Sequence, residues 1–70
     1  MPIAIAPIEK YFKVIRITAN EETKRHIESI GITVDCKIQV VAHSGKTSIC
    51  LVRNTRLAID GNLAMQIFVA

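Results

Sequence analysis

The sequence predicts a mainly β domain: a small five-stranded barrel with one short α-helix at about residues 21–30. Two observations and one physical argument predict this fold class. Only one stretch of the chain has a helix start, a helical apolar stripe and a helix stop in order. Turn residues divide the rest into short segments that have the alternation and β-branched side chains of strands. Closing such strands into a barrel removes exposed sheet edges, and the helix would cover the open end.

Residues 1–10 are expected to be an extended lead-in, and residues 11–70 a single domain. Pro2 and Pro7 restrict the backbone of the lead-in and interrupt its apolar run. The first strand should follow at residues 11–18, where aromatic and β-branched side chains are concentrated.

The expected helix begins after Asn20, whose side-chain oxygen can accept from an otherwise unpaired backbone N–H. Two glutamates follow on the first turn, where the helix dipole favours negative charge. Ile27 and Ile30 form a narrow apolar stripe, and Gly31 stands where a helix usually ends in a left-handed residue. So short a helix cannot bury its own stripe, and we expect it to pack against the strands.

The second strand is expected to end near residue 41, with Cys36, Ile38, Val40 and Ala42 alternating with outward positions. Further strands are expected at residues 47–53, 56–59 and 66–69.

Turn residues separate these strands. Ser44 and Gly45 mark the tip of a hairpin, because Gly adopts positive φ without steric cost. A second turn is expected at Asn54 and Thr55. Asp60 is expected to cap a single helical turn before the last strand.

Composition limits the function classes only loosely. The chain has 70 residues, half of them hydrophobic, with a net charge of +3 and a mean hydropathy of +0.34. Such a surplus of apolar residues favours a partner surface or a homo-oligomer. Mild basicity suits an acidic protein, an anionic membrane face or nucleic acid, and it selects none of them. Aromatic residues make up only 4%, so the core must be aliphatic.

The two cysteines, Cys36 and Cys50, share parity with inward residues. Two reduced core thiols are favoured over a disulfide, because nothing in the sequence indicates secretion. Their spacing is not that of a zinc site.

The apolar start of the chain is too short to cross a membrane. We therefore expect a cytoplasmic location and no membrane insertion.

No motif indicates catalysis or a cofactor. The segment 45–47 (Gly-Lys-Thr) lacks the earlier glycine and the following helix of a phosphate-binding loop. His26 and His43 have no carboxylate or thiolate at ligand spacing, so we expect two solvated histidines and no metal site. The serines lack a recognisable base, and we expect no enzyme.

Two outward side chains suggest a contact surface. If Cys50 and Val52 point inward, alternation turns Ile49 and Leu51 outward. Either a partner or a folded-over segment of this chain would cover such a pair, and the sequence leaves both alternatives open.

Four segments follow one another over about residues 12–69, at residues 27–32, 37–41, 52–59 and 63–69. The second reads Lys-Ile-Gln-Val-Val, and the third reads Val-Arg-Asn-Thr-Arg-Leu-Ala-Ile. In this order they resemble the ferrous iron transport protein A (FeoA) family, whose members are small SH3-like barrels and whose third segment reads Val-Arg-Gly-Ser-Arg-Leu-Ala-Leu. The chain departs from the family at Val34 and Asp35, where Pro-Gly is usual, and in a shorter central hairpin loop.

The resemblance implies a cytosolic accessory or regulatory protein of bacterial ferrous iron uptake. The implied partner is the membrane transporter FeoB, contacted through its cytoplasmic GTPase region, which would hold the protein at the inner membrane face. The candidate partner-binding residues are His43, Ser44, Gly45, Lys46, Ile49 and Leu51.

A small basic barrel that binds nucleic acid is the alternative. It is disfavoured because the three aromatic residues of the chain lie in segments expected to supply core. A direct iron carrier is a third reading, for which we expect weak or no Fe²⁺ binding.

Overall fold

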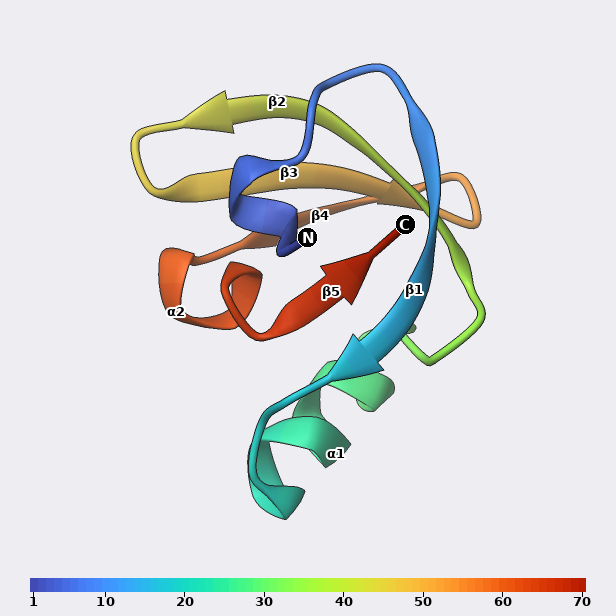
Figure 1. Cartoon of the computed structure of the whole chain (residues 1–70), viewed down its shortest axis with the longest axis vertical. Coiled ribbons are helices and arrows are strands. Elements are labelled where there is room, and N and C mark those ends of the chain that lie inside the picture. The colour runs from blue at the N-terminus through green and yellow to red at the C-terminus, as the bar shows by residue number, and fades with distance from the viewer.

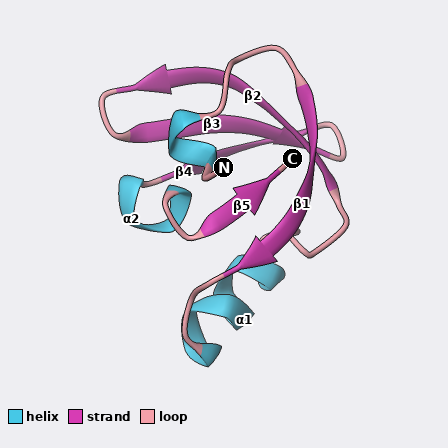
Figure 2. Ribbon diagram, in the orientation of Figure 1, coloured by secondary structure: helices cyan, strands magenta, loops and turns pink.

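The computed structural model describes all 70 residues of the chain. Strands dominate it, as the alternating segments predict (Figures 1 and 2). In chain order the elements are the 3-10 helix η1 (Ile3–Ile5), β1 (Tyr11–Ile17), α1 (Glu21–Ser29), β2 (Lys37–Ser44), β3 (Thr47–Val52), β4 (Thr55–Ile59), α2 (Gly61–Ala64) and β5 (Ile67–Val69). The predicted fold class is confirmed, with five strands and one helix of nine residues.

All five strands form one antiparallel sheet in the order β4–β3–β2–β1–β5. The sheet curls around a single core, and every strand contributes at least one buried side chain (Figure 1). Irregularities in pairing lie between Val14 and Arg16 of β1 and between Val40 and Ala42 of β2. Such bulges increase the local bend and twist of a strand, as a strongly curved sheet requires.

The core is aliphatic apart from one thiol. Fourteen buried hydrophobic residues form a single cluster, of which Cys50 alone is not aliphatic. Ser48 is the one buried polar residue. On β3 the buried positions are Ser48, Cys50 and Val52, which alternate with half-buried neighbours. The prediction that Cys50 and Val52 point inward is therefore confirmed.

The helix α1 has the predicted start and stop. The Asn20 side chain accepts from the Thr23 N–H at 2.8 Å, and Gly31 has a φ of +103°. Ile27 is fully buried, and Ile30 packs against the core from a partly exposed position. The helix lies at one end of the curved sheet (Figure 1). No helix of the chain reaches the length and hydropathy needed to cross a bilayer.

Residues 1–10 differ from the predicted extended lead-in. Ile3–Ile5 form a helical turn, and Ile3 and Ala6 are buried in the core. Met1 exchanges two backbone hydrogen bonds with Val69 of β5, at 3.0 and 2.8 Å. The apolar side chains of this segment thus complete the core, which the local sequence pattern alone could not show.

The second predicted turn is shifted by one residue. Val52 pairs with Thr55, so the turn between β3 and β4 consists of Arg53 and Asn54 rather than Asn54 and Thr55. Both turn residues have positive φ, +51° and +65°. Two-residue hairpin loops require this backbone, because its twist matches that of the flanking strands. Arg is an unusual residue there, which explains why the pattern placed the turn later.

Candidate functional site

The predicted hairpin tip forms the free end of the β2–β3 hairpin. Pairing extends to Ser44 opposite Thr47, which leaves Gly45 and Lys46 as the loop, and Gly45 has a φ of +60°. The four candidates from His43 to Lys46 are all exposed. The tip therefore stands clear of the sheet and is available to a partner.

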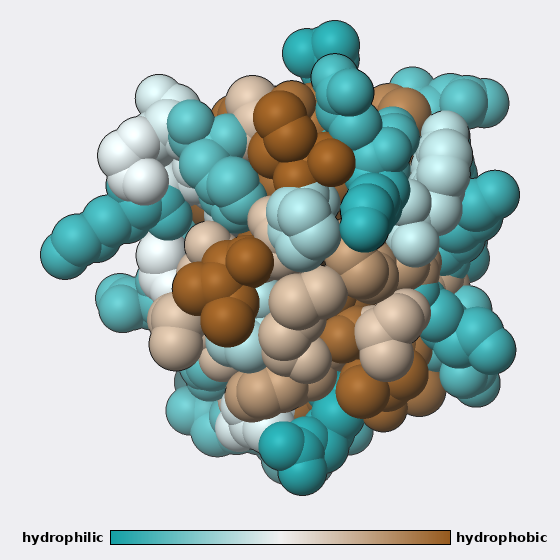
Figure 3. All heavy atoms as spheres, turned by 45° about the horizontal axis from the view of Figure 1, so that its top comes forward, coloured by the Kyte–Doolittle hydropathy of each residue, from teal (hydrophilic) through white to brown (hydrophobic).

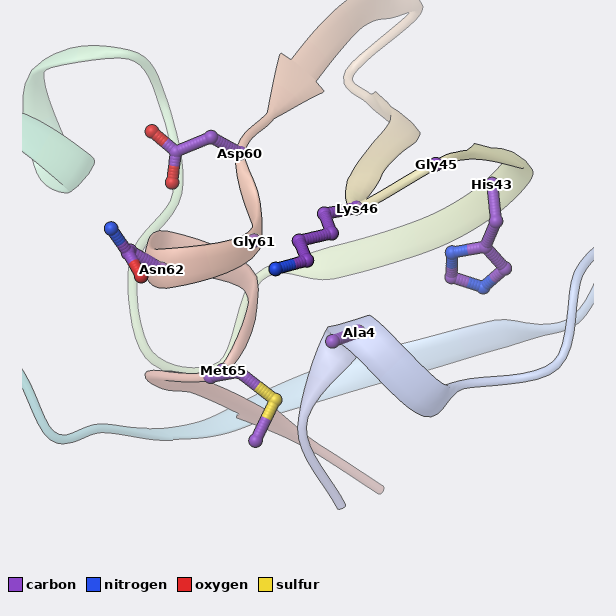
Figure 4. A pocket seen from close by; sticks show the side chains of 8 residues that line it. All are labelled: Ala4, His43, Gly45, Lys46, Asp60, Gly61, Asn62 and Met65. Carbon is purple, nitrogen blue, oxygen red and sulfur yellow. The ribbon is translucent and has the colours of Figure 1, made fainter.

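A cleft of about 750 Å³ lies between this tip, η1 and α2 (Figure 4). Its lining residues are Ala4, His43, Gly45, Lys46, Asp60, Gly61, Asn62 and Met65. The Lys46 side chain extends from the hairpin toward α2 (Figure 4). A Cβ atom added at Gly61 would lie 3.1 Å from the Lys46 Cβ, so the hairpin packs closely against α2 at that glycine.

His43 bridges two segments that are far apart in the chain. Its Nε2 lies 2.9 Å from the Ala6 carbonyl oxygen, and its Nδ1 lies 3.1 Å from the Ser48 hydroxyl. Because a carbonyl only accepts, Nε2 carries the hydrogen, and in the neutral ring Nδ1 accepts from Ser48. His43 is therefore exposed, as predicted for a solvated histidine, but both of its ring nitrogens are hydrogen-bonded within the protein. These bonds hold the N-terminal segment against the hairpin.

Ile49 and Leu51 lie on the opposite face of β3 from its buried residues, as predicted, but both are half-buried. Leu51 shares a shallow hollow of about 370 Å³ with residues of β1, β2 and the β3–β4 turn. Its lining residues are Tyr11, Cys36, Lys37, Leu51, Arg53 and Asn54.

The candidate residues therefore do not share one hollow: His43, Gly45 and Lys46 line the cleft, and Leu51 lines the second hollow. The cleft at the hairpin tip and the hollow at Leu51 have no lining residue in common. The bulge between Val40 and Ala42 explains this separation. It places His43 opposite the inward-facing Ser48, whereas Ala42, predicted to point inward, lies opposite the outward Ile49.

The ionisable groups form no metal-binding cluster. No group of three or more His, Cys, Asp and Glu residues is placed to hold a metal ion. Both cysteines are free, and burial raises the pKa of the Cys50 thiol to about 11. That thiol is protonated at neutral pH and a poor ligand or nucleophile there.

Exposed apolar side chains add to the surface. On one face of the molecule, strongly apolar side chains form clusters with weakly apolar side chains between them, and polar side chains border this area (Figure 3). The large exposed apolar side chains are Met1, Ile5, Ile8, Tyr11, Ile15, Val34 and Met65. Sequence reasoning missed the surroundings of Leu51, although Tyr11 and Lys37 share its outward parity and could have been grouped with it.

Comparisons with known proteins agree on one family description and one fold. The family model described as FeoA domain matches residues 1–70. A crystal structure described as the iron uptake regulatory protein FeoA is 26% identical, with a TM-score of 0.88 over 99% of this chain and 92% of its own. The FeoA protein of Chlorobium tepidum is 17% identical, with a TM-score of 0.86 over 99% of this chain and 68% of its own.

The same fold occurs in a metal-dependent regulator. A manganese-dependent transcriptional repressor is 20% identical, with a TM-score of 0.91 over 100% of this chain but 40% of its own. At that identity the likeness shows the fold alone, the SH3-like barrel. A search of curated protein sequences finds no match.

Proposed function

This chain belongs to the FeoA domain family, and from that premise we propose that it is a non-catalytic accessory protein of ferrous iron uptake that binds the cytoplasmic GTPase region of the transporter FeoB. The family match over residues 1–70 is the observation that carries the proposal, because it implicates the chain in ferrous iron transport. In this function the protein works at the inner face of the membrane, held there by its partner.

The hairpin tip is the first proposed contact. It protrudes from the sheet, and the hydrogen bonds of His43 to Ala6 and Ser48 hold its base in one conformation. A loop held in this way loses little conformational entropy when it binds, which favours affinity. Lys46, exposed at the tip, can meet a carboxylate of the partner.

The outward pair Ile49 and Leu51 is the second proposed contact. Both side chains are half-buried, so each still offers apolar surface that a partner could remove from water. Because Leu51 and the hairpin tip line different hollows, a partner that touches both must contact two hollows. A partner that touches one leaves the other free for a second contact.

An NMR titration of isotope-labelled protein with full-length FeoB from the same organism, in detergent, tests the proposal. We expect selective broadening at the hairpin tip or at Ile49 and Leu51. Lys46→Glu should weaken the contact by about tenfold, because it replaces an attraction by a repulsion. Arg25→Glu, the same change of charge at an exposed position of α1, is the matched control.

Spectra that stay unchanged at a large excess of the transporter would contradict the proposal. Equal weakening by Lys46→Glu and Arg25→Glu would show that the tip makes no specific contact.

A further inference from the structure

We propose that the outer face of β1–β4 binds an acidic segment of a protein partner, in which carboxylates flank an apolar side chain. We call this surface the basic face and define it by Tyr11, Lys13, Lys37, Leu51, Arg53 and Arg56. Because it presumes a protein partner, the inference rests on the proposed function, and it adds the chemistry of the segment that the partner presents.

Strand register places these side chains on one face. Tyr11 lies opposite Gln39, Gln39 opposite Leu51, and Leu51 opposite Arg56, a row that crosses four strands. Side chains of directly opposed residues point to the same side of a sheet. With strands about 4.8 Å apart, the row is about 14 Å long, the length of about four extended residues. No carboxylate belongs to it.

The floor of this face is apolar and its rim is basic. Leu51 is half-buried in the hollow that also holds Tyr11, Lys37 and Arg53, and no Asp or Glu lines that hollow. The Lys37 Nζ lies 4.3 Å from the centre of the Tyr11 ring, a cation–π contact that orients the ammonium group across the face. An apolar side chain would cover Leu51 while carboxylates meet the rim.

Four cations meet on the basic face. Lys13 lies directly opposite Lys37, and both are exposed, as are Arg53 and Arg56. Like charges directly opposite on a sheet are destabilising, so this pair lowers the stability of the free protein unless an anion lies between them. Three of the six side-chain carboxylates are on α1, and the two nearest to Tyr11 and Lys37 in the sequence, Glu9 and Asp35, lie in the adjoining loops.

Arg53 occupies its place on this face in a backbone conformation that lowers the stability of the protein. Its φ of +51° is a left-handed conformation, which costs a non-glycine residue about 1 kcal/mol or more. Strained residues that persist in a structure are found preferentially at functional sites. Lys37, one of the opposed lysines, and the strained Arg53 line the same hollow, where bound carboxylates would offset both costs.

An acidic peptide fits this face better than nucleic acid. Proteins that bind single strands stack successive bases on several aromatic side chains, and Tyr11 is the only aromatic residue of this face. The apolar Leu51 at its centre suits an aliphatic side chain rather than a phosphate. Arg and Lys clusters around such a floor are a recurring way to recognise acidic motifs.

The test uses a fluorescent synthetic peptide with the repeat Glu-Ser-Leu-Ser, so that Glu and Leu alternate at every second position. A matched peptide carries Gln in place of each Glu. Fluorescence anisotropy with the full chain should show binding of the Glu peptide, weakened by added salt, and little binding of the Gln peptide. Lys37→Glu and Arg56→Glu should each weaken binding by about tenfold, while Arg25→Glu on α1 should leave it nearly unchanged.

Three results would overturn the inference. The first is equal binding of the Glu and Gln peptides. The second is weakening by Arg25→Glu that equals the weakening by Lys37→Glu and Arg56→Glu. The third is displacement of the labelled peptide by a thymine oligonucleotide at a lower concentration than the unlabelled Glu peptide needs at the same salt. Each variant is first checked for a wild-type NMR spectrum, and Lys13→Glu replaces any variant that does not fold.

The same variants separate this inference from the proposed transporter contact. If the transporter titration is intact in Lys37→Glu and Arg56→Glu but lost in Lys46→Glu, the contact stands and the basic face is not part of it. If the wild-type protein shows no binding in the transporter titration, the proposed function fails. The peptide result is measured without the transporter and stands by itself.

Discussion

The two ring nitrogens of His43 connect the N-terminal segment to the β2–β3 hairpin, although the two lie far apart in the sequence. The only buried polar residue is Ser48, and the His43 ring is the hydrogen-bond partner of its hydroxyl. The ring also supplies the donor for the Ala6 carbonyl. No other side chain hydrogen-bonds the N-terminal segment to the β2–β3 hairpin, so this residue adds to the backbone bond from the Glu9 N–H to the Val40 carbonyl and to the packing of Ile3.

Replacing this histidine should destabilise the protein. We expect His43→Ala to lower the free energy of unfolding by about 1–2 kcal/mol, because it leaves a buried hydroxyl and a carbonyl without partners. Urea denaturation measures the loss, and Ser44→Ala, an exposed neighbour, should change stability by less than about 0.5 kcal/mol. Adding Ser48→Ala to His43→Ala should cost less than the two separate losses, and full additivity would show that the bond contributes nothing.

Burial of the Cys50 thiol makes stability depend on alkaline pH. Its pKa is raised to about 11 in the folded state, so an unfolded chain releases this proton first, near pH 9. Stability should therefore fall between about pH 9 and 11, by up to about 1.4 kcal/mol per pH unit. Denaturation curves of the wild type and of Cys50→Val at several pH values test this. A variant with the same alkaline slope as the wild type would contradict it.

The elements of this chain differ in how far the sequence predicts them. Asn20 and Gly31 identified α1 at both ends, because caps depend on the chemistry of single residues. Asp60 was identified in the same way, and its side chain accepts from the Leu63 N–H at 2.9 Å. Strands with regular alternation were also found, because alternation follows directly from burial of one face.

Features that depend on long-range contacts were not predicted. The N-terminal turn at Ile3–Ile5 exists because its side chains complete a core built by strands much later in the sequence. The bulge after Val40 changes which residues face inward, so Ala42, predicted to point inward, lies opposite the outward Ile49. Neither effect leaves a signal in the residues where it occurs.

Substitution in the β3–β4 turn should raise the stability of the protein and weaken its binding of the acidic peptide. Replacing Arg53 and Asn54 by Asn and Gly, the preferred pair for this turn type, should raise the free energy of unfolding by about 0.5–1 kcal/mol. The loss of the Arg53 guanidinium should weaken binding of the Glu peptide. Thermal unfolding and anisotropy measure the two effects, and Asn54→Gly alone should stabilise without loss of binding. A double variant that binds as well as the wild type would exclude Arg53 from the basic face.

At the scale of the whole molecule, the first and last residues form one structural unit. Met1 and Val69 exchange hydrogen bonds, and Pro2 lies opposite Phe68. This contact covers the edge of β5, which would otherwise be a free strand edge open to pairing with another chain. The segment therefore contributes both to the core and to the protection of the sheet.

Removing residues 1–6 should unfold most of the protein at room temperature. The deletion takes Ile3 and Ala6 out of the core and exposes the β5 edge. Ile3→Ala alone should cost about 2–5 kcal/mol, against a total stability of about 5–15 kcal/mol for proteins of this kind. Ile5→Ala is the control, since that side chain is 67% exposed and should matter little. A deletion variant with native chemical-shift dispersion and an unchanged melting temperature would contradict this role.

The pairing of the two chain ends also has a consequence for biosynthesis. β5 comprises Ile67–Val69, so the strand that lies between β1 and the segment of Met1 and Pro2 is made after every other strand of the barrel. While a ribosome still holds those residues in its exit tunnel, Ile67 and Val69 cannot enter the core. Emerging strands can pair into a hairpin earlier, but the barrel closes only after β5 has left the tunnel. Until then a nascent chain exposes the apolar faces of β1 and η1 to chaperones and to neighbouring chains.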